Sequence, residues 1–76
     1  MALMHIIDRM LGDKKIVWRE DDKDSLKKAR EIFKEKLMAG WLAFKIDPKN
    51  PKEGKMLRDF DEKAPKIILT PPVGGG

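Results

Sequence analysis

The chain has 76 residues, a formal net charge of +4 and no cysteine. This length allows one small domain and excludes a second domain or a large enzyme pocket. The lack of cysteine excludes disulfides, thiolate metal sites and a cysteine nucleophile, and it fits a reducing compartment. No apolar run is long enough to span a membrane, and the run from Leu3 to Ile7 is too short for a signal peptide, so we expect a cytoplasmic protein.

Charged residues make up 39% of the chain, and Asn50 is the only residue with a side-chain amide. This bias resembles the composition of thermophile proteins, in which lysine and glutamate replace labile amides. The lysines are interleaved with Asp and Glu and do not form one basic block. That pattern favours an ordinary solvated surface over a nucleic-acid footprint, so we expect neither a nucleic-acid partner nor a membrane partner.

Two strands joined by a turn are predicted at the N-terminus. The run from Leu3 to Ile7 is almost continuously apolar, which is typical of a strand buried on both faces. Residues 8–13 carry the Asp and Gly residues of a turn. Residues 14–19 then alternate, with Ile16 and Trp18 on one face of a second strand.

An amphipathic helix is predicted over about residues 23–39. Asp21, Asp22 and Asp24 are good N-cap residues and favourable charges for a helix start. Gly40 provides the left-handed residue that commonly ends a helix. An apolar stripe at three- and four-residue spacing predicts one buried face, formed by Leu26, Ala29, Phe33 and Leu37.

The remaining chain predicts three further strands. Residues 41–46 form an apolar strand, and residues 47–54 have the composition of a loop. Met56 to Phe60 is a short fourth strand, and Pro65 marks a break. The run Ile67-Ile68-Leu69 is the last strand.

The order of these elements predicts an α+β fold, with a ββαββ(β) mixed sheet and one helix. The first and last strands are the most apolar and belong in the centre of the sheet. Placing them side by side and parallel gives a ubiquitin-like β-grasp domain over residues 1–70. A split βαβ sandwich is the competing arrangement, but it needs a second helix. In the β-grasp arrangement, the helix stripe is expected to pack against Ile6, Leu42, Phe44, Ile67 and Leu69.

No catalytic or metal site is predicted. His5 is the only histidine, and it falls in a predicted central strand without a second histidine, a cysteine or clustered carboxylates. A core or sheet-face histidine explains it better than a catalytic base. Trp18 and Trp41 are interpreted as packing residues in preference to a binding surface.

The C-terminal segment has an unusual order of residues. Pro71 and Pro72 each fix φ and lack an N–H, so they favour an extended stalk after the last strand. Val73 completes the stalk, and Gly74, Gly75 and Gly76 add no side chain, so residues 71–76 form a flexible tail that can thread a narrow channel. The alternative interpretation is a passive, frayed end.

The stretch Ile67 to Gly76 resembles the C-terminus of prokaryotic ubiquitin-like sulfur carriers, such as the small subunit of molybdopterin synthase. Members of that family end in an apolar strand, then Pro-Pro-Val, one small residue and Gly-Gly. In this chain, Gly74 takes the small-residue position and Gly75-Gly76 the terminal pair. Residues 59–65 lack the Gly-Asp step common in that subfamily. The resemblance therefore implies the general carrier role more strongly than molybdopterin synthesis.

The resemblance implies a protein that is a substrate and not an enzyme. An E1-like enzyme would adenylate the Gly76 carboxylate with ATP, and the acyl group would then serve sulfur transfer or protein conjugation. The partners would be that adenylating enzyme and either an acceptor protein or a sulfur-using enzyme, and the carrier itself would need no cofactor. The alternative function is a small interaction or structural module, for example of a phage or mobile element, in which the glycine tail is passive.

Overall fold

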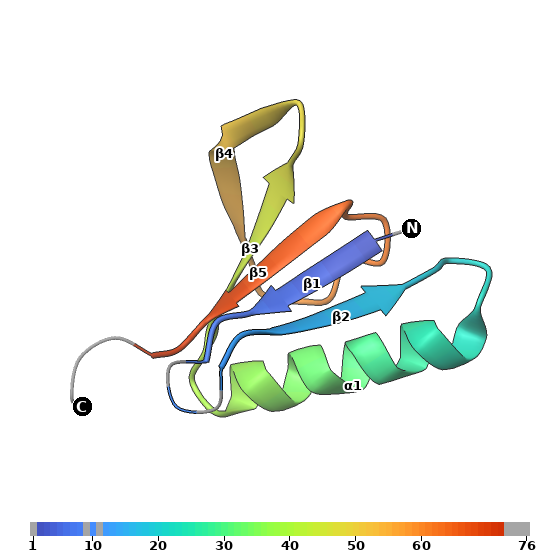
Figure 1. Cartoon of the computed structure of the whole chain (residues 1–76), viewed down its shortest axis with the longest axis horizontal. Coiled ribbons are helices and arrows are strands. Elements are labelled where there is room, and N and C mark those ends of the chain that lie inside the picture. The colour runs from blue at the N-terminus through green and yellow to red at the C-terminus, as the bar shows by residue number, and fades with distance from the viewer. Residues whose placement is uncertain (1, 9, 11, 73–76) are drawn as a thin grey trace.

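A computed structural model describes residues 2–8, 10 and 12–72, and it has the predicted α+β architecture (Figure 1). One helix lies against a five-stranded mixed sheet in a β-grasp-like arrangement. The elements in chain order are β1 (Ala2–Ile6), β2 (Lys14–Trp18), α1 (Lys23–Met38), β3 (Leu42–Asp47), β4 (Asn50–Leu57) and β5 (Lys66–Thr70).

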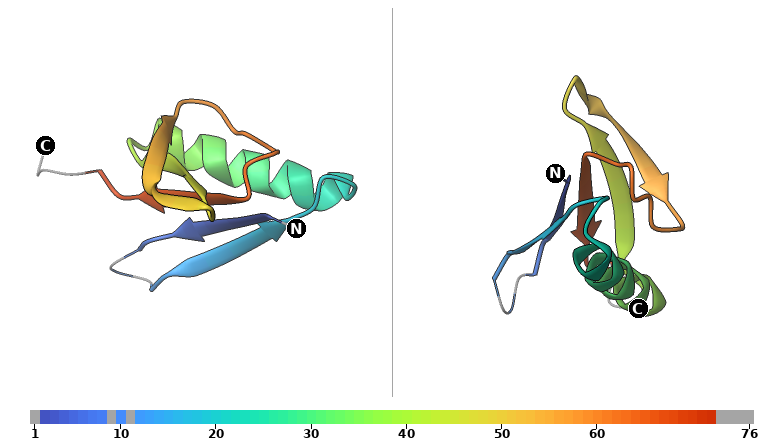
Figure 2. Two further views of the ribbon diagram at one scale, coloured as in Figure 1. Left: turned by 90° about the horizontal axis from the view of Figure 1, so that it is seen from above. Right: turned by 90° about the vertical axis from the view of Figure 1, so that its right-hand side faces the viewer.

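The sheet has the strand order β2-β1-β5-β3-β4. β1 and β5 are parallel neighbours, as predicted, and all other neighbouring strands are antiparallel. Hydrogen bonds from Leu3 N to Pro65 O and from Ile7 N to Leu69 O extend the parallel pair at both ends. Figure 2 shows α1 on one side of the sheet, so the sheet has one covered face and one open face.

The boundaries of α1 follow from its capping residues. The carboxylate of Asp22 accepts hydrogen bonds from the backbone N–H groups of Asp24 and Ser25, so Asp22 is the N-cap among the three aspartates predicted as candidates. At the other end, Gly40 has φ +95°, a left-handed conformation that glycine adopts without a Cβ penalty. Its N–H donates to Leu37 O, and the N–H of Trp41 donates to Lys36 O. This pair of bonds is the Schellman motif that ends helices.

The core lies between α1 and the covered face of the sheet. From α1, Ala29 and Phe33 are fully buried, whereas Leu26 and Leu37 are only partly buried at its edges. Because strand side chains alternate between faces, one residue in two from each strand reaches this core. The sheet residues that are buried there are Met4, Ile6, Trp18, Ala43, Ile67 and Leu69.

The predicted facing of β3 was wrong. Ala43 pairs with Leu69 in the register and is fully buried, so Leu42 and Phe44 point to the open face. Leu42 is 36% exposed. The prediction placed the larger apolar residues inside, but pairing with β5 determines which residues point inward. β1 follows the same rule: Met4 and Ile6 are buried and Leu3 and His5 are half-buried, so β1 is not buried on both faces.

The predicted loop over residues 47–54 was also wrong. Only Pro48 and Lys49 form the turn, and β4 begins at Asn50 and ends at Leu57 instead of running from Met56 to Phe60. Proline is compatible with β4 because this strand lies at the edge of the sheet, where half of its backbone groups need no partner strand. The register between β3 and β4 also shifts between Lys45 and Asp47, so the pairing is irregular and leaves no regular alternation in the sequence.

The connection from β4 to β5 is held against the core by aromatic side chains. The ring centroid of Phe60 lies 5.1 Å from that of Trp18 and 5.6 Å from that of Phe33. Trp18 Nε1 also donates a hydrogen bond to the carbonyl of Glu62 at 3.1 Å. These contacts confirm that Trp18 is a packing residue, and they fix the connection without a second helix.

Candidate functional site

The candidate site is the root of the C-terminal segment, where β5 ends. Thr70, the last residue of β5, pairs with Leu42 of β3, and Pro71 and Pro72 follow. Of the predicted tail residues, Pro71 and Pro72 are described, whereas Val73, Gly74, Gly75 and Gly76 lie outside the described residues. The end of β5, the C-terminal end of α1 and the turn between β1 and β2 lie at the same end of the molecule (Figure 1).

Pro72 lies beside the turn that follows α1. A methyl group built on Gly40 would meet Cβ of Pro72 at 3.7 Å and Cγ at 3.9 Å, which are ordinary van der Waals distances, so the proline ring lies about one methyl group away from the backbone of Gly40. Beside it, Lys36 Nζ lies 4.5 Å from the centre of the Trp41 ring, a cation–π contact. Trp41 is partly buried against the core. The start of the C-terminal segment thus lies beside a turn that is held by the helix-capping hydrogen bonds and by the partly buried Trp41.

The open face of the sheet begins at this root and is largely apolar. The register places five side chains in one row across all five strands: Lys15, His5, Ile68, Phe44 and Met56. A neighbouring row contains Val17, Leu3, Lys66 and Ile46. A third row, nearest to the C-terminal segment, is formed by Thr70 and Leu42.

Several side chains on the open face are accessible to solvent. Met56 is 58% exposed and Val17 49% exposed, and the other apolar members are half-buried or exposed. Of the two lysines on this face, Lys15 lies on the edge strand β2, whereas Lys66 lies at the start of the central strand β5. Apolar side chains gathered on one face and bordered by charge are typical of a protein interaction surface. This surface was not predicted from the sequence, although strict alternation along β3, with Ala43 taken as the buried residue, would have indicated it.

His5 lies on the open face, in agreement with the prediction of a sheet-face histidine. Its side chain is 24% exposed, and its Nε2 is 3.4 Å from Oδ2 of Asp13. Within the described ranges, no group of three or more His, Cys, Asp or Glu residues could hold a metal ion. His5 is therefore a polar member of the apolar face, with one carboxylate beside it.

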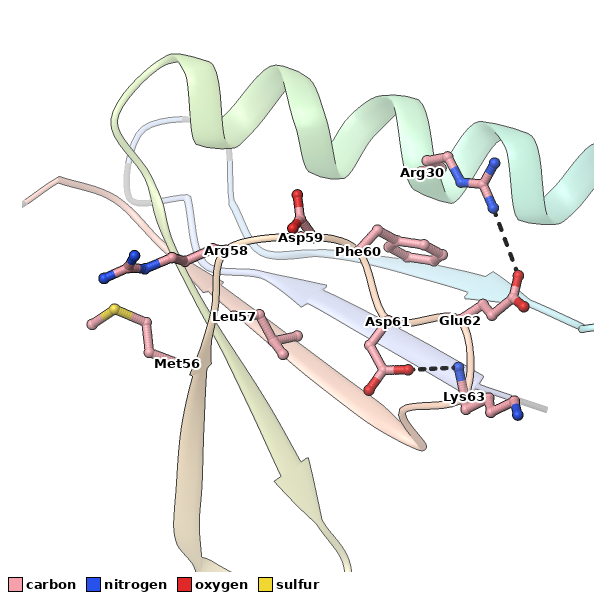
Figure 3. Close-up of a pocket in the computed structure, with 9 residues that line it drawn as sticks. All are labelled: Arg30, Met56, Leu57, Arg58, Asp59, Phe60, Asp61, Glu62 and Lys63. Atoms are coloured by element: carbon pink, nitrogen blue, oxygen red, sulfur yellow. Dashed lines mark hydrogen bonds and ion pairs between the residues drawn. The ribbon is translucent and has the colours of Figure 1, made fainter.

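A groove of about 560 Å³ lies between α1 and the connection from β4 to β5, and it extends to Met56 near the end of β4 (Figure 3). Two ion pairs hold the connection to the rest of the domain. Arg30 of α1 has its guanidinium 3.6 Å from the carboxylate of Glu62, and Lys45 of β3 has its ammonium 3.0 Å from the carboxylate of Asp61. The Lys45 ammonium, with backbone N–H groups of the connection, holds the pKa of Asp61 below its usual range. An acid that is held ionised in this way is suited to bracing the connection and not to donating protons.

Comparisons of the chain with protein-family models, with curated proteins and with solved structures gave no match. In the part of the chain that the structure describes, no helix combines the length and apolar character needed to cross a bilayer. The functional argument therefore depends on the geometry of the C-terminal segment and the open face.

Proposed function

We propose that the chain is a ubiquitin-like carrier or modifier protein that acts through the carboxylate of Gly76. An E1-like enzyme would join this carboxylate to the α-phosphate of ATP, releasing pyrophosphate and leaving an acyl-adenylate. A sulfur donor or an acceptor lysine would then attack the acyl carbon, with AMP as the leaving group. Such ATP-dependent chemistry fits a cytoplasmic protein. The chain itself supplies no catalytic residue in this scheme, because its partners hold the machinery.

One observation carries the proposal: the parallel central strand β5 runs directly into Pro71 and Pro72 at the end of an open apolar sheet face. A strand paired on both sides is a rigid support. Proline extends the chain away from that support because its φ is fixed and it cannot join a central strand. The position therefore suits a segment that must be presented to another protein.

The open face supplies the second part of the proposal, a docking surface for the adenylating enzyme or the acceptor. Apolar residues on it, Phe44 and Ile68 among them, are half-buried in the free chain and can lose further exposed area on binding. The row of Thr70 and Leu42 connects this face to Pro71. A partner bound on the open face would therefore lie next to the segment that it has to receive.

Truncation tests the proposal. Removing Gly75 and Gly76 is expected to leave the melting temperature unchanged, because these residues follow the last strand. The same change should abolish ATP–pyrophosphate exchange by a purified E1-like enzyme encoded in the same genome, because the carboxylate no longer reaches the nucleotide. A chain with Pro48→Gly in the turn between β3 and β4 is the control and should be adenylated normally. Equal exchange by the truncated and full chains would refute the carrier role.

A second function, a non-enzymatic interaction module with a passive tail, is favoured by the open face itself, since an exposed apolar face can bind a partner unaided. Intact-mass measurement on protein from its native host separates the two. A C-terminal thiocarboxylate, or Gly76 joined to lysines of other proteins, supports the carrier. A free carboxylate in every preparation, with full function of the truncated chain, supports the module.

A further inference from the structure

An apolar well adjoins the groove between α1 and the connection from β4 to β5. It has a volume of about 220 Å³ and lies beside the C-terminal half of α1. Phe33 and Leu37 of α1 and Phe60 of the connection supply most of its apolar surface. Since a cavity of about 150 Å³ can hold a benzene molecule, this well has room for one bulky apolar side chain.

Met38 stands at the rim of the well, and its side chain is 90% exposed. A single exposed apolar residue is ordinary on a protein surface, but this one adjoins an open apolar well that it does not fill. Methionine is unbranched and polarizable, and its sulfur packs favourably at the edge of an aromatic ring. Phe60 supplies such a ring in the well, held edge-on against Phe33 at a centroid distance of 5.6 Å. The chemistry of a methionine side chain therefore fits this well.

The charges on the rim of the well have both signs. Lys34 and Arg58 are cations and Asp59 is an anion, and none of the three forms an ion pair with another described residue. A uniformly acidic partner would therefore be repelled by Asp59, and a uniformly basic partner by the two cations. A rim of mixed charge is matched best by a second surface of mixed charge.

We propose that two copies of this chain associate through the well, with Met38 of each copy inserted into the well of the other. In a two-fold interface both copies use the same patch, so a protruding side chain and the well that receives it must lie side by side on one surface. Met38 and the well meet this requirement. The two-fold arrangement also lets Asp59 of each copy face the cations of the other. This association goes beyond the carrier function and does not depend on it.

The proposed contact leaves the open face of the sheet uncovered. The helix α1 and the open face lie on opposite sides of the sheet (Figure 2). A dimer formed through α1 would therefore present two open faces, and a partner with two binding sites would gain from the raised effective concentration. Because each copy contributes one anchor side chain and a small patch, we expect a weak, reversible dimer, typical of interfaces that bury less than about 1,200 Å².

Sedimentation equilibrium of the full chain, over micromolar to millimolar concentrations, tests the association. The average mass is expected to rise from that of a monomer toward that of a dimer. Met38→Lys should raise the Kd of the dimer at least about tenfold, because each dimer loses two identical anchors. Its melting temperature should stay that of the parent chain, since the replaced side chain is 90% exposed. Met10→Lys is the matched control, because Met10 is 93% exposed and does not line the well, and it should dimerise like the parent.

Isotope-filtered NMR on an equal mixture of labelled and unlabelled chains locates the contact. Nuclear Overhauser effects are expected between the Met38 methyl group of one chain and the Phe60 ring of the other. If this contact arises only within one chain, Met38 fills its own well and the proposal is wrong. A chain that stays monomeric at every concentration would overturn it as well, and so would a Met38→Lys variant that dimerises as strongly as the parent.

Discussion

The two faces of the sheet differ sharply although they are built from the same strands. In β5, Ile67 and Leu69 are completely buried under α1, whereas Ile68 between them is half-buried on the open face. In β3, the buried residue is the small Ala43, and the larger Phe44 points outward. Size and hydropathy therefore do not distinguish the residues of the buried core from those of the open face. The direction of each side chain, set by the strand register, makes that distinction.

The largest effect expected from this comparison concerns the centre of the covered side. Phe33 is 1% exposed and packs edge-on against Phe60. Phe33→Ala should lower the free energy of unfolding by about 3–5 kcal/mol, because it removes a buried ring and leaves a cavity. Thermal or denaturant unfolding measures the change. The neighbouring exposed Lys34→Ala should stay within about 0.5 kcal/mol, and a similar loss at both positions would contradict the assigned helix face.

Adjacent isoleucines in β5 provide a direct test of the two faces. Ile67→Ala should lower the free energy of unfolding by about 2–5 kcal/mol, since the isoleucine side chain is completely buried. Ile68→Ala should cost about 1 kcal/mol, because part of its surface already contacts water. Both variants remove the same atoms from the same strand, so β propensity and backbone effects cancel in the comparison. Equal losses in denaturant unfolding would contradict the assignment of these two residues to different faces.

A smaller effect is expected from the ion pair on the covered side. Lys45 is in register with Ile67, and its ammonium contacts Asp61 at 3.0 Å, with both side chains about one-third exposed. Asp61→Asn should lower the free energy of unfolding by about 0.5–1 kcal/mol at pH 7.

The pH dependence of this effect has a definite sign. Because the pKa of Asp61 is lower in the folded chain, its stabilisation is complete above the pKa of the unfolded carboxyl, about 3.9, and is lost as the pH falls through the folded value. Denaturant unfolding should therefore show that the parent chain has a higher free energy of unfolding than Asp61→Asn at pH 7, and that this difference shrinks below about pH 4. If this difference in free energy grew toward acid pH, the stabilising contact assigned to the ionised Asp61 would be contradicted.

The smallest change in stability is expected on the open face. Met56→Lys replaces a side chain that is 58% exposed, so the free energy of unfolding should change by no more than about 0.5 kcal/mol. The same variant should weaken binding of the adenylating enzyme, seen as a raised KM in ATP–pyrophosphate exchange, because a charge interrupts the apolar row. Met38→Lys is the matched control, since Met38 is 90% exposed on α1, away from that face. Equal effects of both substitutions on KM would remove the open face from the proposed interface.

Much of the fold was predictable from local patterns. The Asp22 cap, the apolar stripe around Ala29 and Phe33, and Gly40 determined α1 almost to the residue, because capping and helical periodicity are local properties. The continuous apolar runs of β1 and β5 placed these strands next to each other inside the sheet, because a strand flanked by others must exclude water. The end of β5 at Thr70 was also predictable, since the prolines that follow cannot continue a central strand, whereas the extended stalk stays a prediction.

Tertiary structure alone determined the remaining features. β4 contains Pro51 and Gly54 and forms a strand because it pairs with β3 at the edge of the sheet, an interaction without a local signal. The inward direction of Ala43 follows from its pairing with Leu69, and Pro72 lies near Gly40 although the two residues are far apart in the sequence. Short-range sequence patterns record what a segment prefers by itself. Strand register and long-range contacts arise only when the elements pack together, and that packing created the open face and set the root of the tail.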